Sequence, residues 1–221
     1  MKRVKDTFLS VIQRVVPLQG KDVLDIGCGN GSRTAEIAQV CAHVSGVDPD
    51  PKAVRIAQRL GIANCEIFQK SADRLWFKNA VFDVVIFTLS YHHIQSEKMN
   101  VAIDEAIRVL RPDGSIVFFE PTWIGTFFEA EITFGAFDGD ERRAKALAYA
   151  AMLAHPGLIE IAELHDETQI SFDSLEDFIE STHPTSSDHE AMRNFLGTHA
   201  RILTAQRRFN IFTVKPLVDP S

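Results

Sequence analysis

Three glycines at positions 27, 29 and 31 follow directly after an apolar, β-branched run that contains Asp25. The run predicts a buried strand, and the glycines predict a tight turn, because glycine adopts a positive φ freely and lets a ligand approach the backbone. Asp25 could orient that turn or meet a cationic group. Ser32 occupies the place of the third glycine in a dinucleotide fingerprint. We therefore expect a ligand-binding loop whose ligand the glycines alone do not identify.

A second acidic residue, Asp48, ends another apolar run that begins at Val44. A carboxylate at the end of a strand in this type of sheet can accept hydrogen bonds from both hydroxyls of a ribose. Asp50 and Pro51 then predict a helix, with Asp50 as its N-cap and proline at its first position. The spacing favours a ribose-binding role for Asp48, and a helix-capping or surface acid is the alternative.

Side chains that could move a proton follow the next two apolar runs. His93 or Tyr91, after the run 82–88, could take a proton from a hydroxyl or amine of a substrate. An imidazole with its ordinary pKa of about 6.5 suits this role. Glu120, at the end of the run 115–120, is another candidate base or orienting group. The alternatives are that His93 holds a loop by hydrogen bonding and that Glu120 caps a strand or helix.

The other histidines and the cysteines predict neither a metal site nor covalent chemistry. The chain has eight histidines, and those from residue 155 onward are scattered without the i, i+4 or close Cys/His spacing of metal ligands. The three cysteines form no C-x-x-C pair, which indicates reduced thiols in the cytoplasm. Cys28 is expected to fill the glycine loop as a small side chain. The sequence also contains no nucleophile elbow and no phosphate-binding P-loop.

Apolar runs and helical patterns alternate from residue 21 to residue 121, which predicts a parallel sheet covered by helices on both faces. Ligands of such sheets bind at the carboxyl ends of the strands. The expected strands lie near 22–27, 43–48, 65–70, 82–88 and 115–120, and the expected helices near 32–41, 51–60 and 97–110.

The pattern changes after Pro121. Residues 122–140 are rich in phenylalanine, glycine and acids, and an alanine-rich helix capped by Asp140 is expected over 141–154. Residues 159–172 predict a strand or a hairpin. Helices are then expected to open at the capping boxes of 173–176 and 187–190, and the last strand covers 208–217.

Four segments, in this order and at this spacing, resemble the class I S-adenosylmethionine-dependent methyltransferases of the small-molecule type. They are VLDIGCGNG at 23–31, GVDPD at 46–50, FDVVIFTLSYHHI at 82–94 and AIRVLRPDGSIVFFEP at 106–121. The resemblance implies a Rossmann-like, doubly wound, mostly parallel seven-stranded sheet whose last strand is antiparallel at the edge. It also implies a methyltransferase domain made of 1–121 and 159–221, with 122–158 as a helical lid over the substrate.

The resemblance further implies S-adenosylmethionine as the cofactor and assigns residues to it. The glycine loop would surround the amino-acid and ribose parts, and Asp48 would hold the ribose. Ser71 aligns with the usual adenine-binding acid, although Asp73 is the alternative. The expected cofactor-binding residues are Asp25, Gly27, Cys28, Asn30, Gly29, Gly31, Asp48, Pro49, Ser71, Ala72, Thr88 and Leu89.

Composition limits the classes of partner. Lys and Arg number 23 against 30 Asp and Glu, and the resulting net charge of −7 argues against duplex nucleic acid. No window approaches the roughly 20 apolar residues of a membrane span, and the N-terminus lacks a signal-peptide pattern. Apolar residues of the first segment instead predict an amphipathic helix. These are Val4, Phe8, Val11, Ile12 and Val15.

The sequence therefore predicts a cytoplasmic enzyme that methylates a small, partly apolar acceptor at O, N or C. The acceptor would lie between the strand ends and the phenylalanine-rich segment. Two alternatives belong to other classes: an NAD(P)-dependent oxidoreductase, and a non-catalytic S-adenosylmethionine-binding module that dimerises through 122–158.

Overall fold

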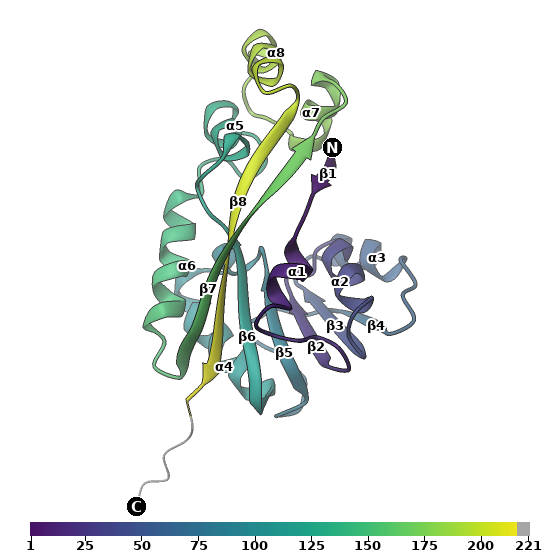
Figure 1. The fold of residues 1–221 in the computed structure, drawn as a ribbon, viewed down its shortest axis with the longest axis vertical. Coiled ribbons are helices and arrows are strands. Elements are labelled where there is room, and N and C mark those ends of the chain that lie inside the picture. The colour runs from purple at the N-terminus through teal and green to yellow at the C-terminus, as the bar shows by residue number, and fades with distance from the viewer. Residues whose placement is uncertain (216–221) are drawn as a thin grey trace, which may run out of the picture.

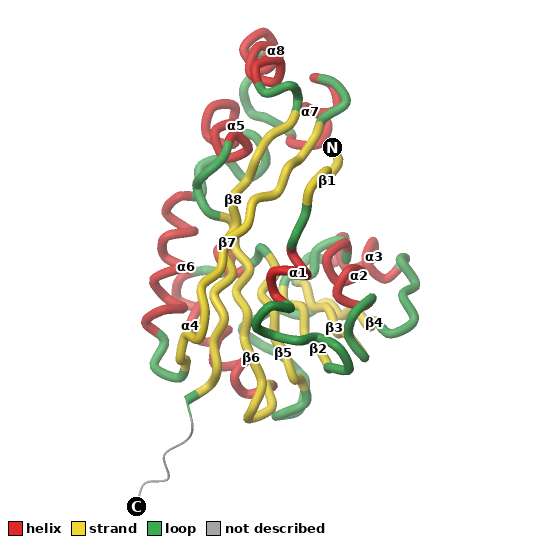
Figure 2. Tube along the Cα trace, in the orientation of Figure 1, coloured by secondary structure: helices red, strands yellow, loops and turns green. Residues whose placement is uncertain are grey.

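In the computed structural model, which describes residues 1–215, eight strands form one sheet in the order β1-β7-β8-β6-β5-β2-β3-β4. Figures 1 and 2 show this twisted sheet with helices on both of its faces. Neighbours β3 and β5 flank β2 on opposite sides, so the strand order reverses at β2, where ligands of such sheets bind. This arrangement confirms the predicted Rossmann-like architecture. The five parallel strands are β2 (Asp22–Ile26), β3 (His43–Asp48), β4 (Cys65–Gln69), β5 (Phe82–Thr88) and β6 (Leu110–Pro121).

The C-terminal strand β8 (Ile202–Val214) is antiparallel, as expected, but its predicted place at the sheet edge is wrong. It lies between β6 and β7 (Leu158–Ser171) and pairs with both along most of its length. A short strand, β1 (Lys2–Lys5), pairs antiparallel with the far end of β7. The described sheet therefore has eight strands rather than seven, and Val4 belongs to an exposed strand and not to the first helix. The predicted end of the last strand, at Leu217, falls outside the described residues.

Each face of the sheet is covered by a different pair of helices. The helices α1 (Phe8–Ile12) and α2 (Ser32–Ala38) bury Phe8, Ile12 and Ile37 against one face. The helices α4 (Ser96–Val109) and α6 (Arg142–Ala154) cover the other face. The apolar side chains in this second layer include Ile103, Ala106, Ala148 and Met152. A third helix, α3 (Pro51–Gln58), packs beside β3 and β4. Burial of both faces explains the nearly unbroken apolar runs of the central strands.

The ends of β7 and β8 extend beyond the rest of the sheet and carry a separate helical cluster (Figure 1). The cluster contains α5 (Thr126–Phe134), α7 (Leu175–Thr182) and α8 (His189–Thr198). Its apolar core includes Phe134, Phe178, Met192, Leu196 and Leu203. The predicted insertion 122–158 thus contributes α5 to this cluster and α6 to the cover of the sheet. Its role as a lid stays a prediction.

Helix starts follow the capping chemistry with two differences. Asp50 caps α3, since its side chain accepts a hydrogen bond from the Lys52 amide at 2.8 Å. The N-cap of α6 is Glu141 rather than Asp140, and that of α8 is Asp188 rather than the predicted Ser187. Among residues 1–215, no helix has both the length and the apolar character needed to cross a membrane.

Candidate functional site

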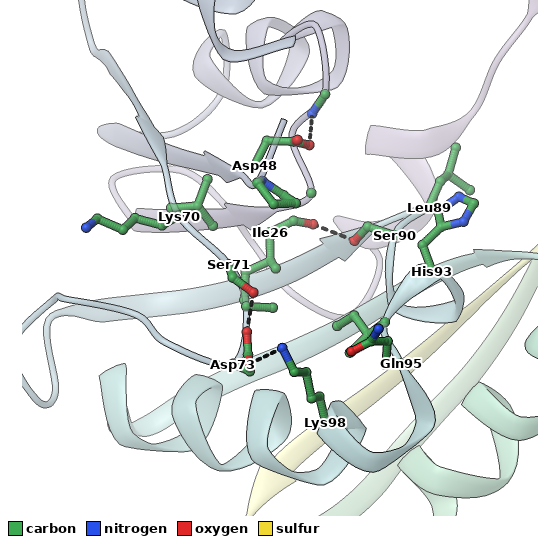
Figure 3. Close-up of a pocket in the computed structure, with 16 residues that line it drawn as sticks. Ile26, Asp48, Lys70, Ser71, Asp73, Leu89, Ser90, His93, Gln95 and Lys98 are labelled. Atoms are coloured by element: carbon green, nitrogen blue, oxygen red, sulfur yellow. Dashed lines mark hydrogen bonds and ion pairs between the residues drawn. The ribbon is translucent and has the colours of Figure 1, made fainter. Parts of the chain in front are cut away.

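A cavity of about 680 Å³ opens at the carboxyl ends of β2, β3, β4 and β5 (Figure 3). Its size lies within the range of roughly 300–1,000 Å³ that is typical of small-molecule sites. Several residues predicted to bind the cofactor line it: Gly27, Gly29, Asp48, Pro49, Ser71, Ala72 and Leu89. The other predicted residues, Asp25, Cys28, Asn30, Gly31 and Thr88, lie outside this lining.

The glycines of the turn after β2 are required for different reasons. Gly27 has a φ of +76°, and a side chain there would overlap with Ser90. A side chain at Gly31, at φ +83°, would approach Ala57 and Leu60 less closely, with its Cβ at 2.9 and 3.0 Å from them. Gly29, at φ +53°, has no atom of another residue within 4 Å of its added Cβ position. Gly27 and Gly31 therefore permit close packing, whereas Gly29 leaves space beside the cavity.

Asp48 is fixed at the cavity wall by backbone donors. The amide of Gly29 donates to its Oδ2 and the amide of Asp50 donates to its Oδ1, both at 2.9 Å. The carbonyl of Val47 in turn accepts from the amides of Gly27 and Cys28, at 2.8 and 3.1 Å. The end of β3 and the glycine turn therefore form one rigid unit. Each carboxylate oxygen can still accept from a ligand hydroxyl, because it has two lone pairs.

Asp25 is completely buried beneath the turn. Its carboxylate contacts other protein groups and does not line the cavity. The hydroxyl of Thr34, in α2, donates to its Oδ2 at 2.6 Å. Burial raises the pKa of Asp25 to about 6, despite that hydrogen bond. The structure is therefore consistent with the predicted orienting role, because Asp25 ties α2 to the end of β2. It does not present Asp25 to a cationic group of a ligand in this cavity.

Ser71 and Asp73, the two candidates for adenine recognition, both line the cavity and contact each other (Figure 3). The Ser71 hydroxyl donates to Asp73 Oδ1, and Lys98 lies 3.1 Å from Asp73 Oδ2. The hydrogen bond from Ser71 and the contact with Lys98 lower the pKa of Asp73. Both oxygen-bearing side chains are thus available on the same wall, and the sequence alternative stays open.

The three predicted proton-transfer residues occupy different environments. His93 lines the large cavity, and its side chain is 49% exposed. Tyr91 is buried against Phe87 and Phe118, outside that lining, and burial raises the pKa of its hydroxyl. Glu120 is also buried, and its carboxylate accepts from the amides of Ser90 and Tyr91 at 3.0 and 2.8 Å. Among the three, His93 alone can meet a ligand in the large cavity.

Glu141, which was not predicted as a site residue, contacts both histidines of the turn Tyr91–His93. Its carboxylate oxygens lie 3.5 Å from His92 Nε2 and 3.3 Å from His93 Nδ1. Glu120 binds the other ring nitrogen of His92, Nδ1. Burial lowers the pKa of His92, but the two carboxylates outweigh it and raise that pKa to about 9. Glu141 begins α6, and no local spacing in the sequence connects it to His93.

A smaller cavity of about 180 Å³ lies between the sheet and α5. Leu89 borders it as well as the large cavity, so this residue is common to the walls of both. Its apolar wall includes Ile124, Phe127 and Phe128, which belong to the phenylalanine-rich segment. Lys145 and Glu131, 3.5 Å apart, form a buried ion pair at its polar wall.

Comparison with known proteins locates the similarity in the first half of the chain. Residues 23–114 match a family model described as a methyltransferase domain. An uncharacterized methyltransferase of Anoxybacillus flavithermus is 29% identical over 124 residues, which cover 55% of this chain and 57% of that protein. A demethylmenaquinone methyltransferase of Tropheryma whipplei is 30% identical over 106 residues, covering 46% and 42%. The chain thus spans about half the length of the curated relatives it matches.

Solved structures share the fold over nearly the whole chain. A putative methyltransferase of Bacillus halodurans has a TM-score of 0.67 at 16% identity, covering 96% of this chain and 100% of that one. A methyltransferase of Aquifex aeolicus, described as S-adenosylmethionine-dependent, has a TM-score of 0.56 at 12% identity, covering 90% and 88%. At these identities the likeness concerns the fold alone. The chain therefore shares the fold of these methyltransferases, and residues 23–114 match a methyltransferase domain, in agreement with the motifs that resemble class I S-adenosylmethionine-dependent methyltransferases.

Proposed function

We propose that this protein transfers the methyl group of S-adenosylmethionine to a small, partly apolar acceptor, through an O, N or C nucleophile. The observation that carries the proposal is the carboxylate of Asp48, which the Gly29 amide holds at the wall of the large cavity. The cavity fits a nucleoside cofactor because it combines this acceptor, the open space at Gly29 and a second polar wall at Ser71 and Asp73.

The bound cofactor would supply an electrophilic methyl group, so the protein has to bind, align and exclude water. In this proposal Asp48 accepts hydrogen bonds from the ribose hydroxyls, and Ser71 or Asp73 accepts from the adenine amino group. The turn at Gly29 leaves room for the sugar and the amino-acid part. Leu89 contacts the methionine part and separates it from the smaller cavity.

The smaller cavity is our proposed acceptor site, because Leu89 borders both cavities and the aromatic wall of Phe127 and Phe128 suits an apolar body. Its volume, about 180 Å³, resembles that of protein cavities that hold a single benzene ring. His93 is the proposed proton acceptor for a hydroxyl or amine nucleophile. Tyr91 and Glu120 would act through the structure of the turn rather than on the substrate.

Calorimetric titration with S-adenosylmethionine tests the proposed cofactor site. Asp48→Asn removes the charge and one acceptor oxygen, and a lost hydrogen bond to a charged group is worth about 1.5–3 kcal/mol. We therefore expect the affinity to fall roughly ten- to a hundredfold. Glu66→Gln is the matched control, because Glu66 is an exposed carboxylate on β4 that does not line the cavity. Equal affinity of wild type and Asp48→Asn would contradict the site.

Two further measurements separate the proposed function from its alternatives. A thermal-shift panel of NAD, NADP and S-adenosylmethionine should show stabilisation by the last of these alone. Stabilisation by a dinucleotide instead would favour an oxidoreductase. A radiolabelled methyl-transfer assay against fractionated metabolites, with protein and RNA fractions alongside, should label a small molecule. Binding without transfer to any fraction would favour a non-catalytic module.

A further inference from the structure

A cluster of two imidazoles and one carboxylate lies beside the large cavity. It consists of His92 and His93 from the turn after β5 and Glu141 from the start of α6. One potential ligand atom from each residue falls within a group whose members are all less than 4.8 Å apart. The side chains of His92 and Glu141 are 3% and 13% exposed, so the cluster is shielded, while the half-exposed His93 connects it to the cavity.

Two separations within this cluster are close to those between ligands of one metal ion. Glu141 Oε1 lies 3.3 Å from His93 Nδ1, and Glu141 Oε2 lies 3.5 Å from His92 Nε2. Two ligands at about 2.0–2.1 Å from a tetrahedral Zn²⁺ ion are about 3.3–3.4 Å apart.

Glu120 supplies the outer support that such a site requires. Its carboxylate binds His92 Nδ1 and accepts from two amides of the same turn. A histidine that ligates a metal usually donates its other ring N–H to a carboxylate, which fixes the tautomer and the ring orientation. This arrangement orients His92 Nε2 toward Glu141. Lys145 also contacts Glu141, with its Nζ 3.5 Å from Oε2.

We infer that His92, His93 and Glu141 form a binding site for a divalent transition-metal ion such as Zn²⁺. Imidazole ligands favour Zn²⁺ and its neighbours over Mg²⁺ or Ca²⁺, which prefer oxygen. Three protein ligands are the number found in catalytic zinc sites, where water or substrate completes the coordination. Because His93 also lines the large cavity, the ion lies next to the proposed cofactor site.

The position of the ion suggests a role in activating the acceptor, and this consequence rests on the proposed function. A hydroxyl that binds the ion would lose its proton to the solvent far more readily than the free group does. Its oxygen would then be the nucleophile. His93 would serve as a ligand, and the ion would take over the deprotonation assigned to His93 in the metal-free protein. Ion binding itself does not depend on methyl transfer.

The test is a titration of tag-free, chelator-treated protein with Zn²⁺ and with Co²⁺, in the absence of S-adenosylmethionine. Calorimetry should show one ion per chain, and Co²⁺ should give the visible absorption bands of a low-coordinate site. His93→Ala and Glu141→Gln should each weaken binding at least tenfold. His165→Ala should leave it unchanged, because His165 pairs with Glu163 on β7, away from the cluster.

Three results would overturn the inference. The first is no stoichiometric binding by the wild-type protein, and the second is equal affinity of wild type and both ligand variants. The third is Co²⁺ spectra that do not change in these variants. In each case the cluster would be a charged His92 held between two glutamates. His93 is half exposed, so its variants should fold, and His93→Gln provides a second variant of similar size. Failure here leaves the Asp48→Asn result for the cofactor unaffected.

Discussion

Replacement of Gly27 by alanine tests the close approach between the glycine turn and the segment after β5. The added Cβ would lie 2.5 Å from Ser90 Oγ and still closer to Ser90 Cβ. Ser90 cannot simply turn away, because its hydroxyl donates to the Ile26 carbonyl at 2.6 Å. Overpacking of this kind costs about 1–3 kcal/mol, and the positive φ of +76° adds about 1 kcal/mol for alanine. We expect Gly27→Ala to lower the free energy of unfolding by about 2–4 kcal/mol.

A second substitution shows whether the overlap is the cause. Ser90→Gly removes both offending atoms, and the nearest remaining atom, Ser90 Cα, would be 3.6 Å from the new methyl group. Ser90→Gly alone costs about 1–2 kcal/mol, for the hydrogen bond and the added glycine flexibility. In the double variant the overlap is relieved, so the stability that Gly27→Ala loses through overpacking should be regained. This appears as a coupling energy of about 1–3 kcal/mol in a double-mutant cycle.

Urea denaturation followed by far-ultraviolet circular dichroism measures all members of this cycle in one buffer. Gly29→Ala is the control, because its φ is also positive but its added Cβ meets nothing within 4 Å. This control should cost about 1 kcal/mol and should not couple to Ser90→Gly. Additive effects of Gly27→Ala and Ser90→Gly, within about 0.5 kcal/mol, would refute the reasoning.

Two further predictions concern buried carboxylates. Burial raises the pKa of Asp25 to about 6, so the native state loses stability as the pH rises from about 4 through 6. Asp25→Asn cannot ionise and avoids this loss. Its free energy of unfolding, relative to that of wild type, should therefore rise by up to about 3 kcal/mol across that pH range. If urea denaturation gives the same difference in the free energy of unfolding between the variant and wild type at every pH, the prediction is contradicted. Asp6 is the opposite case, because despite burial its hydrogen bonds with Arg33 and Arg207 lower its pKa. Asp6→Asn should lower the free energy of unfolding by about 2 kcal/mol near neutral pH. The difference should shrink below about pH 4 and vanish only below the lowered pKa of the native carboxyl. A difference that does not change with pH in the same assay would contradict this.

The parallel half of the fold was predictable because its signals are local. Several of its strands are apolar runs that end at a glycine turn or at an acid, as β2 ends just before Gly27 and β3 ends at Asp48. The place of β8 was not predictable in the same way. It depends on pairing between residues far apart in the chain, such as Glu120 with Arg208, and no neighbouring residues encode that choice. The extra strand β1 likewise forms only because β7 is long enough to offer it a free edge.

In the candidate site, too, contacts fixed by local motifs were predictable, whereas contacts between distant segments were not. Gly29 and Asp48 meet because two neighbouring parallel strands end at the same edge, and the motif spacing already implies it. Glu141 reaches His93 only because α6 packs beside α4 and places its first turn over the strand ends. A search for metal ligands by spacing along the chain therefore misses this cluster. Asp25 was identified as important, but burial turns it toward Thr34 rather than toward the cavity.

Under the proposed function, the different construction of the two cavities also indicates which residues determine acceptor specificity. The proposed cofactor site is built mainly from backbone geometry at strand ends, which many sequences can satisfy, and the family match ends at residue 114. The smaller cavity is built from side chains that seven separate segments contribute, from Arg3 to Arg207. A single substitution at such a surface changes shape and charge without disturbing the sheet beneath it. Under the proposed function, variants at Phe127, Phe128 and Lys145 should therefore change which acceptor is labelled in the methyl-transfer assay, while S-adenosylmethionine binding is retained.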